Sequence, residues 1–247
     1  MFIKKALTIA ALSAVASLSY AGSAHALGFT YNAGSFRTPG VTSEGSFSNN
    51  VNQQGYTTFD FNNGAVPGND TVKYSFSSAA PLPTPGQTGI YTDQWAPSGV
   101  SGEVNKSNYL AVFQGNDAII QANDGKKFNY FGLNLGALSS GNTLRFFDGA
   151  NLVKELTYEL MTKLAPTAAQ QHGGEKNGFF EFFSEGNNDN FDKIVLSQVG
   201  GGGFETDNHT FRVGTGKYTS VPEPGIVLGL VGVGGMFLRK RKSQKTA

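Results

Sequence analysis

Residues 143–158 read TLRFFDGANLVKELTY, and this stretch predicts the fold class. Two runs of strand-forming residues, Thr143 to Phe147 and Leu152 to Tyr158, flank the turn residues Asp148-Gly149-Ala150-Asn151. A short Asp-Gly loop between two such runs is a strong signal for a β-hairpin. We therefore expect two antiparallel strands joined by a tight turn.

Similar runs continue on both sides of this hairpin. Thr71 to Phe76 alternates, which places Val72, Tyr74 and Phe76 on one face of a strand. About ten strands at hairpin spacing predict an all-β protein, an antiparallel β-sandwich with a jelly-roll-like arrangement, over residues 27–214. A helical pattern occurs only at Glu159 to Leu164, where Pro166 would end it. The other expected strands are Thr57 to Phe61, Tyr109 to Phe113, Ala118 to Gln121, Phe128 to Leu135, Phe179 to Phe183, Phe191 to Ser197 and Phe204 to Val213.

The composition agrees with a β-rich domain. The chain contains 33 glycines and 20 phenylalanines, and only 15% of its 247 residues are charged. Many glycines and aromatic residues with few charges fit strands joined by tight turns better than helical bundles. The absence of cysteine excludes thiol catalysis, disulfide bonds and cysteine-ligated metals.

The N-terminus has the three parts of a secretory signal peptide. Lys4 and Lys5 precede an apolar run from Ala6 to about Leu18, and Ala24-His25-Ala26 follows. A basic region, an apolar region and a small-x-small cleavage site in this order direct export. We expect the secretion machinery to export the chain and residues 1–26 to be removed by cleavage after Ala26.

The C-terminus also has three parts. Pro222-Glu223-Pro224 precedes an uncharged, glycine-rich run over residues 225–238, and Arg239-Lys240-Arg241-Lys242 follows. A helix of this length spans about 21 Å at about 1.5 Å per residue, against about 30 Å for a hydrocarbon core. We expect a short membrane segment with its basic flank in the cytoplasm, which places the middle of the chain outside the inner membrane. The segment 215–220 is expected to be a linker.

This tripartite tail, residues 221–247, resembles the PEP-CTERM sorting signal of Gram-negative bacteria. The resemblance implies that the partner is an exosortase, a membrane protease that cuts near Pro222-Glu223-Pro224 and releases or transfers the rest to the cell surface. An extended peptide suits a protease, and the two prolines favour that conformation. An ordinary C-terminal membrane anchor is the alternative.

Several interior segments resemble strands of a group of PEP-CTERM surface proteins. The similarity includes Asn190 to Leu196, Gly200 to Gly203, Phe204 to Phe211, Phe128 to Leu133 and Leu144 to Gly149. It covers about half of the expected domain. The resemblance implies a surface protein and brings no biochemical activity with it.

Charge excludes one class of partner. The whole chain has a net charge of +1, but residues 27–221 hold 12 basic and 17 acidic residues, a net charge of −5. A nucleic-acid-binding domain would be basic, so no nucleic-acid partner is expected. Calcium and neutral glycans are compatible with this charge.

Two long loops are expected, at Ala79 to Gly102 and at Ala165 to Asn177. The first holds Tyr91 and Trp95, and Tyr109 follows it. Because aromatic faces stack on sugar rings, Trp95, Tyr91 and Tyr109 are the candidate sugar-binding residues. The alternative is that Trp95 anchors its loop to the core.

Acidic residues suggest two further possibilities. Asp60 and Asp207 are the candidate ligands of a structural calcium ion, because carboxylate oxygens bind this cation. The alternative is that Asp207 and Asn208 hydrogen-bond the neighbouring backbone and pin the turn. For glycoside hydrolysis, the candidate carboxyls are Glu181 and the pair Glu205 and Asp207. If Phe180 and Phe182 face the core, Glu181 is a solvated residue on the opposite face.

Taken together, the sequence predicts an exported, exosortase-processed surface or extracellular-matrix protein without enzymatic activity. The expected setting is the cell envelope or an extracellular polysaccharide, after transient anchoring in the inner membrane. The first alternative is a carbohydrate-binding module that uses loop aromatics, and the second is a calcium-dependent glycoside hydrolase.

Overall fold

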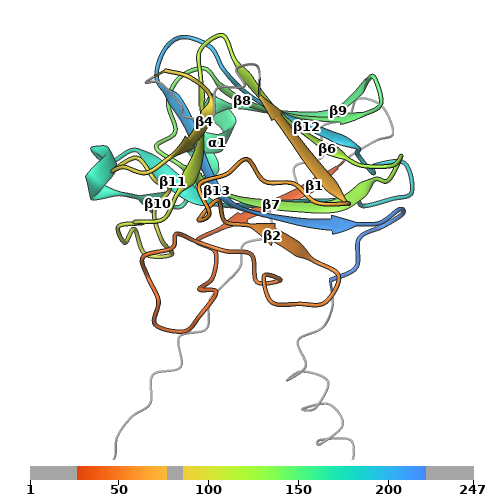
Figure 1. Ribbon diagram of the computed structural model, residues 1–247, viewed down its shortest axis with the longest axis horizontal. Helices are drawn as coiled ribbons and strands as arrows, with labels where there is room; N and C mark the ends of the chain where they lie inside the picture. Colours follow the sequence, from red (N-terminus) through yellow and green to blue (C-terminus); the bar gives the residue numbers. More distant parts are fainter. Residues whose placement is uncertain (1–26, 77–85, 221–247) are drawn as a thin grey trace, which may run out of the picture.

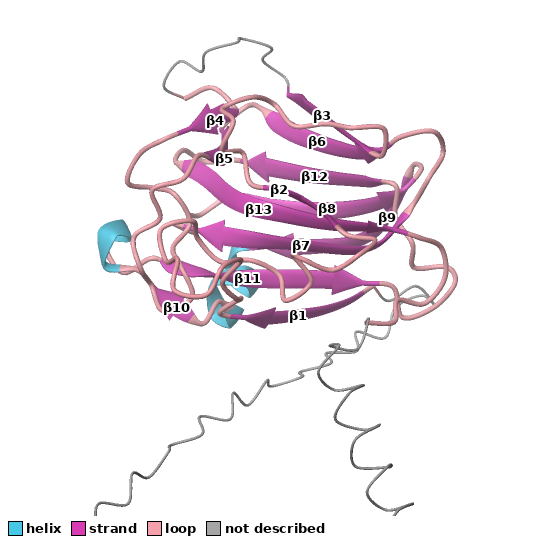
Figure 2. Ribbon diagram, turned by 60° about the horizontal axis from the view of Figure 1, so that its bottom comes forward, coloured by secondary structure: helices cyan, strands magenta, loops and turns pink. Residues whose placement is uncertain are grey.

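Two antiparallel β-sheets lie face to face in the computed structural model, which describes residues 27–76 and 86–220 (Figure 1). The described part is therefore an all-β sandwich, as the hairpin pattern predicts. Figure 2 shows the strands of the two sheets running in similar directions in two layers. The predicted signal peptide and sorting signal lie outside the described residues.

The larger sheet has eight strands and carries the sites discussed below. In spatial order its main path is β1 (Gly28–Asn32), β11 (Lys176–Phe183), β7 (Phe128–Gly136), β13 (Gly203–Val213), β5 (Tyr109–Phe113) and β4 (Gly89–Tyr91). Two short strands lie off this path, β10 (Thr167–Ala168) beside β11 and β2 (Thr57–Phe59) beside β13.

The smaller sheet has five strands and contains the predicted hairpin. Its order is β3 (Val72–Phe76), β6 (Asp117–Ala122), β12 (Lys193–Gln198), β8 (Asn142–Asp148) and β9 (Asn151–Thr157). Strands β8 and β9 pair antiparallel from Thr143 opposite Thr157 to Asp148 opposite Asn151, which confirms the hairpin. Gly149 in its turn has φ +59°, a conformation that glycine adopts without strain.

The expected helix is also present. Helix α1 (Tyr158–Leu164) follows β9 directly and ends before Pro166. A 3-10 turn, η1 (Gln170–His172), lies in the second predicted loop. No helix within residues 27–76 and 86–220 is long and apolar enough to span a membrane.

The hydrophobic core fills the space between the two sheets. Phe131 and Phe182 come from the large sheet, and Phe146 comes from the small one. The Phe146 ring lies 4.4 Å from that of Phe182 and 6.1 Å from that of Phe131, measured between centroids. These side chains are fully buried, and rings at such distances and tilts stabilise a core beyond their buried area.

Strand β13 has a bulge that decides which of its side chains enter the core. Asp207 pairs with Asn134 and Thr210 pairs with Gly132, so β13 uses one residue more than β7 between these pairs. Asn208 supplies the extra residue and has φ +52°. After the bulge, the alternation places His209 in the core, against Phe61 and Phe131.

The outer faces of the two sheets differ. On the small sheet, buried and partly exposed residues alternate along β8, as in a sheet with one solvated face. Every residue of β7 in the large sheet is buried, because loops cover its outer face. Segments 33–56 and 92–108 supply this cover and hydrogen-bond to outward residues such as Asn134 and Asn208.

Four segments differ from the sequence-based expectations, among them β10, which lies in the second predicted loop. The first predicted loop contains β4, and residues 28–32, for which no strand was expected, form β1. The expected linker 215–220 packs against the domain: the Gly216 N–H donates to Asn190, and the Tyr218 ring stacks on Tyr130 at 5.0 Å. These contacts therefore hold residues 215–220 against the sandwich.

Candidate functional site

A pocket of about 550 Å³ lies on the outer face of the large sheet. Its volume falls in the range of small-molecule sites, about 300–1,000 Å³. Its lining comes from β4, β5 and β13 and from the loops beside them. The lining residues are Gly86, Tyr91, Asp93, Trp95, Tyr109, Phe113, Ala137, Ser139, Glu175, Gly202, Gly203 and Glu205.

The register of the sheet explains the surroundings of Glu205. Glu205 on β13 lies opposite Ala111 on one side and Gly136 on the other, and Ala111 lies opposite Gly89. Because these cross-strand neighbours are small, the covering loop comes close to the sheet here: Pro97 lies directly over Gly136, and Glu205 is only 6% exposed. Its carboxyl group extends back over Gly203, where a Cβ atom would collide with it. The row therefore holds one long acidic side chain among small residues.

The next row of the sheet is aromatic. Tyr91 and Tyr109 lie opposite each other on β4 and β5, with ring centroids 6.3 Å apart. The Tyr91 ring also contacts Phe113 edge-on at 5.5 Å. These rings form an apolar wall of the pocket beside Glu205. Of the two predicted sugar-binding residues among them, Tyr91 is partly exposed and Tyr109 is buried, at 2% exposure.

Trp95 completes the aromatic set from the adjoining loop. It is 39% exposed, and its ring stacks on His172 at 5.8 Å with an angle of 20°. Asp93 fixes the loop, because its Oδ1 accepts hydrogen bonds from the Trp95 N–H at 2.8 Å and the Tyr109 hydroxyl at 2.6 Å. The exposure means that Trp95 leaves part of its ring accessible and does not serve only as a core anchor.

The pocket is acidic. It is lined by three carboxyl groups, those of Asp93, Glu175 and Glu205, and none of its described lining residues is lysine, arginine or histidine. Burial raises the pKa of Glu205 to about 8, and the charges of Glu175 and Asp93 add to the effect. Burial also raises the pKa of Glu175 and of Tyr109, and the hydrogen bond to Asp93 raises that of Tyr109 further.

The structure thus brings the three predicted sugar-binding residues Trp95, Tyr91 and Tyr109 to one pocket. It adds Asp93 and Glu175, which sequence reasoning missed. Glu175 lies in the second predicted loop, far from the first in sequence, and no local motif marks it. Perturbed carboxyl groups in a cleft are a common feature of functional sites.

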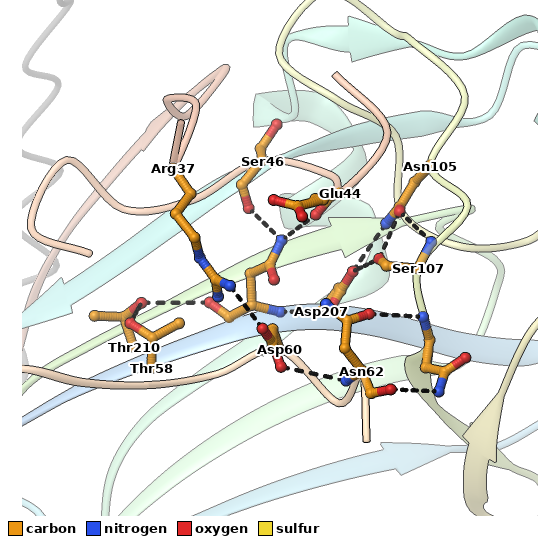
Figure 3. Close-up of polar contacts among 12 residues, drawn as sticks. Arg37, Glu44, Ser46, Thr58, Asp60, Asn62, Asn105, Ser107, Asp207 and Thr210 are labelled. Atoms are coloured by element: carbon orange, nitrogen blue, oxygen red, sulfur yellow. Dashed lines mark hydrogen bonds and ion pairs between the residues drawn. The ribbon is translucent and has the colours of Figure 1, made fainter. Parts of the chain in front are cut away.

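The two predicted calcium ligands lie close to each other but are bound to different partners (Figure 3). Asp60 follows β2 and pairs with Arg37, whose Nη1 lies 2.7 Å from its Oδ2. Burial opposes the ionisation of Asp60, but the hydrogen bonds from Arg37 and Asn62 outweigh it and lower the pKa of this carboxyl group. Asp60 is therefore an ion-paired carboxylate.

Asp207 lies on β13, two residues beyond Glu205, and is fully buried. Its Oδ2 accepts hydrogen bonds from Asn105 at 2.8 Å and Ser107 at 3.1 Å, and its Oδ1 accepts one from the Asn208 N–H at 2.7 Å. Burial raises the pKa of Asp207 well above its ordinary value despite these donors. The carboxyl group fastens the loop that holds Asn105 to the sheet.

Asn208 fastens the other covering loop. Its Nδ2 donates to the carbonyl groups of Glu44 at 2.7 Å and Ser46 at 3.0 Å. Residues 207 and 208 thus bond to backbone and loop groups, as the alternative to metal binding predicts. In the described part of the chain, no group of three or more His, Asp or Glu side chains is placed to hold a metal ion. Calcium at Asp60 and Asp207 stays a prediction, which thermal unfolding with calcium against a chelator tests.

Glu181 on β11 faces away from the core, since Phe180 and Phe182 point inward. It is only partly solvated, however, because the Ser48 hydroxyl of the covering loop donates to its Oε1 at 3.4 Å. The Tyr130 hydroxyl donates to its Oε1 at 2.5 Å, and Asn32 donates to its Oε2 at 3.3 Å. Glu181 therefore links β11 to β1, to β7 and to the loop that holds Ser48. Of the hydrolase candidates, Glu205 lines the pocket, whereas Glu181 and Asp207 do not.

The remaining predicted sites lie outside the described residues. They are the cleavage residues Ala24 and Ala26, the motif Pro222-Glu223-Pro224 and the basic cluster Arg239-Lys240-Arg241-Lys242. In comparisons with known proteins, no family model and no curated protein matches the chain. The class of protein that fold and pocket define is a β-sandwich with a ligand-sized pocket on one sheet.

Proposed function

We propose that this chain is an exported surface protein whose β-sandwich binds a glycan in the acidic aromatic pocket. The observation that carries the proposal is that Trp95, Tyr91 and Tyr109, all within residues 91–109, line one pocket with Glu205 from the distant strand β13. Sugar rings have apolar faces and hydroxyl edges, and the pocket offers aromatic rings next to hydrogen-bonding carboxyl groups. Such a mixture of apolar wall and few polar groups is typical of small-molecule sites.

A glycan array with the purified protein tests this function, followed by calorimetry on the sugars that bind. We expect Trp95→Ala to weaken binding about tenfold or more, since tenfold corresponds to about 1.4 kcal/mol. Phe36→Ala is the matched control, because Phe36 is similarly exposed, at 37%, and does not line the pocket. No binding to any glycan, or equal affinities for the two variants, would overturn the proposal.

We propose that the domain binds its glycan without cleaving it. The glycosidase alternative draws on the same pocket, because hydrolysis uses two carboxyl groups across a cleft. Incubating a bound oligosaccharide with the protein and measuring released reducing ends separates the two. Release that Glu205→Gln abolishes would replace the binding module with a hydrolase.

For sorting, we propose export through residues 1–26 and recognition of Pro222-Glu223-Pro224 by an exosortase. Residues 225–238 would form the membrane segment, and the sandwich would have jelly-roll-like connectivity. The support is the order of motif, apolar run and basic cluster in the sequence. Intact-mass measurement of surface material is expected to show loss of residues 239–247. A surface species that retains them would overturn processing.

A further inference from the structure

The charges of the pocket restrict its ligand. Asp93, Glu175 and Glu205 supply the carboxyl groups of its described lining, and no cationic side chain occurs among those lining residues. Two unit charges 4 Å apart interact by about 4 kcal/mol at a dielectric constant near 20. A uronic acid would bring a further carboxylate next to Asp93 and Glu175 and would be repelled.

One carboxyl oxygen of Glu205 has no hydrogen-bond donor, and a ligand could supply one. The residue is 6% exposed, and its Oε2 atom is buried without a hydrogen-bond partner in the described structure. A buried acceptor without a donor costs free energy, about 1–3 kcal/mol. The Oε2 atom is itself covered, but the Glu205 side chain lines the pocket, so a donor on the ligand would satisfy Oε2 once the carboxyl group turns toward it.

The surroundings favour a cationic donor over a neutral hydroxyl. The charges of Glu175 and Asp93 act on Glu205 and help to raise its pKa, so the three groups repel one another when ionised. A hydroxyl group would satisfy one oxygen and leave this repulsion in place, whereas an ammonium group would satisfy the oxygen and offset the repulsion. The partly exposed ring of Tyr91 lies alongside, and aromatic faces attract cations as well.

Resting on the proposed glycan-binding function, we propose that the pocket selects a glycan with a free amine, an amino sugar that is not acetylated. Its ammonium group would lie among the carboxyl groups of Glu205, Glu175 and Asp93, and its ring would stack on Trp95. The carboxyl groups then decide which sugar binds, and the aromatic residues provide most of the affinity.

Calorimetry with three oligosaccharides of equal length tests the selection at neutral pH, where the amine is protonated. The approach of an ammonium group favours the ionised form of Glu205, which burial otherwise keeps protonated. The probes are oligomers of glucosamine, of N-acetylglucosamine and of galacturonic acid. We expect the glucosamine oligomer to bind at least about tenfold more tightly than the acetylated one, and the uronate not to bind. Added salt should weaken the first interaction more than the second.

Charge-neutral variants identify the groups responsible. Glu205→Gln and Glu175→Gln should each reduce the preference for the amine over the acetylated oligomer to less than about threefold. Glu155→Gln is the control, because Glu155 lies on β9 of the other sheet, paired with Arg145. Circular dichroism verifies that each variant is folded.

The possible outcomes distinguish a failure of amine selection from a failure of glycan binding. If the acetylated or uronate oligomer binds as tightly as the glucosamine oligomer, amine selection is refuted and glycan binding stands. An unchanged preference in both Glu205→Gln and Glu175→Gln also refutes it. If none of these oligomers and no glycan on the array binds, the proposed function itself fails.

Discussion

Replacing Glu205 by glutamine is expected to stabilise the folded protein at neutral pH. Glutamine has nearly the same size and shape but does not titrate. The wild-type carboxyl group is buried among small residues and beside two other acidic groups, which raise its pKa from 4.5 to about 8. The folded protein therefore holds a proton that the unfolded chain releases.

The magnitude follows from this difference in pKa. Below pH 4.5 both states are protonated, and the carboxyl group imposes no penalty. Between 4.5 and about 8, only the unfolded state loses its proton, so the free energy of unfolding falls by about 1.4 kcal/mol for each pH unit. At neutral pH the loss amounts to about 3 kcal/mol, which the variant would not incur because its amide does not titrate.

Urea unfolding followed by circular dichroism measures the effect at several pH values for Glu205→Gln and wild type. The variant should be more stable by about 3 kcal/mol at neutral pH, and the difference should vanish near pH 4. Glu155→Gln, an exposed substitution on the other sheet, should stay within about 1 kcal/mol of wild type throughout. A difference that does not change with pH, or a less stable variant at neutral pH, would refute the reasoning.

Four further substitutions test the fold. Burial lowers the pKa of His209 from 6.5 to about 3, so only the unfolded chain gains a proton there between neutral pH and pH 5. Over this range the free energy of unfolding of wild type should fall by about 2 kcal/mol relative to that of His209→Gln. Urea unfolding curves with the same pH dependence for both would contradict this. Gly141→Ala should cost about 3 kcal/mol in thermal unfolding, since Gly141 has φ +92° and a Cβ would overlap the Val199 carbonyl oxygen. Gly125→Ala, at φ +67° in open space, should cost only about 1 kcal/mol, and similar losses for both glycines would count against the overlap. Phe146→Ala removes a ring from the middle of the core and should cost about 3–5 kcal/mol in urea unfolding, whereas a loss below about 1 kcal/mol would contradict its position.

Local patterns were sufficient to predict the strands of the hairpin and helix α1. The run of strand-forming residues from Thr143 to Phe147 and the Asp-Gly turn depend on a few neighbouring residues, so they can be read from the sequence. The bulge at Asn208 was not predicted, because it depends on pairing with β7. Strand β4 was taken for part of a loop, because its three residues are too few to show a period.

The sequence alone determined three things: the sandwich class, the acidic charge of the middle segment, and the aromatic candidates Trp95, Tyr91 and Tyr109. The tertiary structure decided what surrounds these candidates, because β13 lies between β5 and β7 and thereby places Glu205 beside residues far from it in the chain. Burial and nearby charge, which set the pKa of Glu205, arise only from that arrangement. It also separated Asp207 from the pocket, since the same strand holds this carboxyl group under loops that satisfy it with hydrogen bonds.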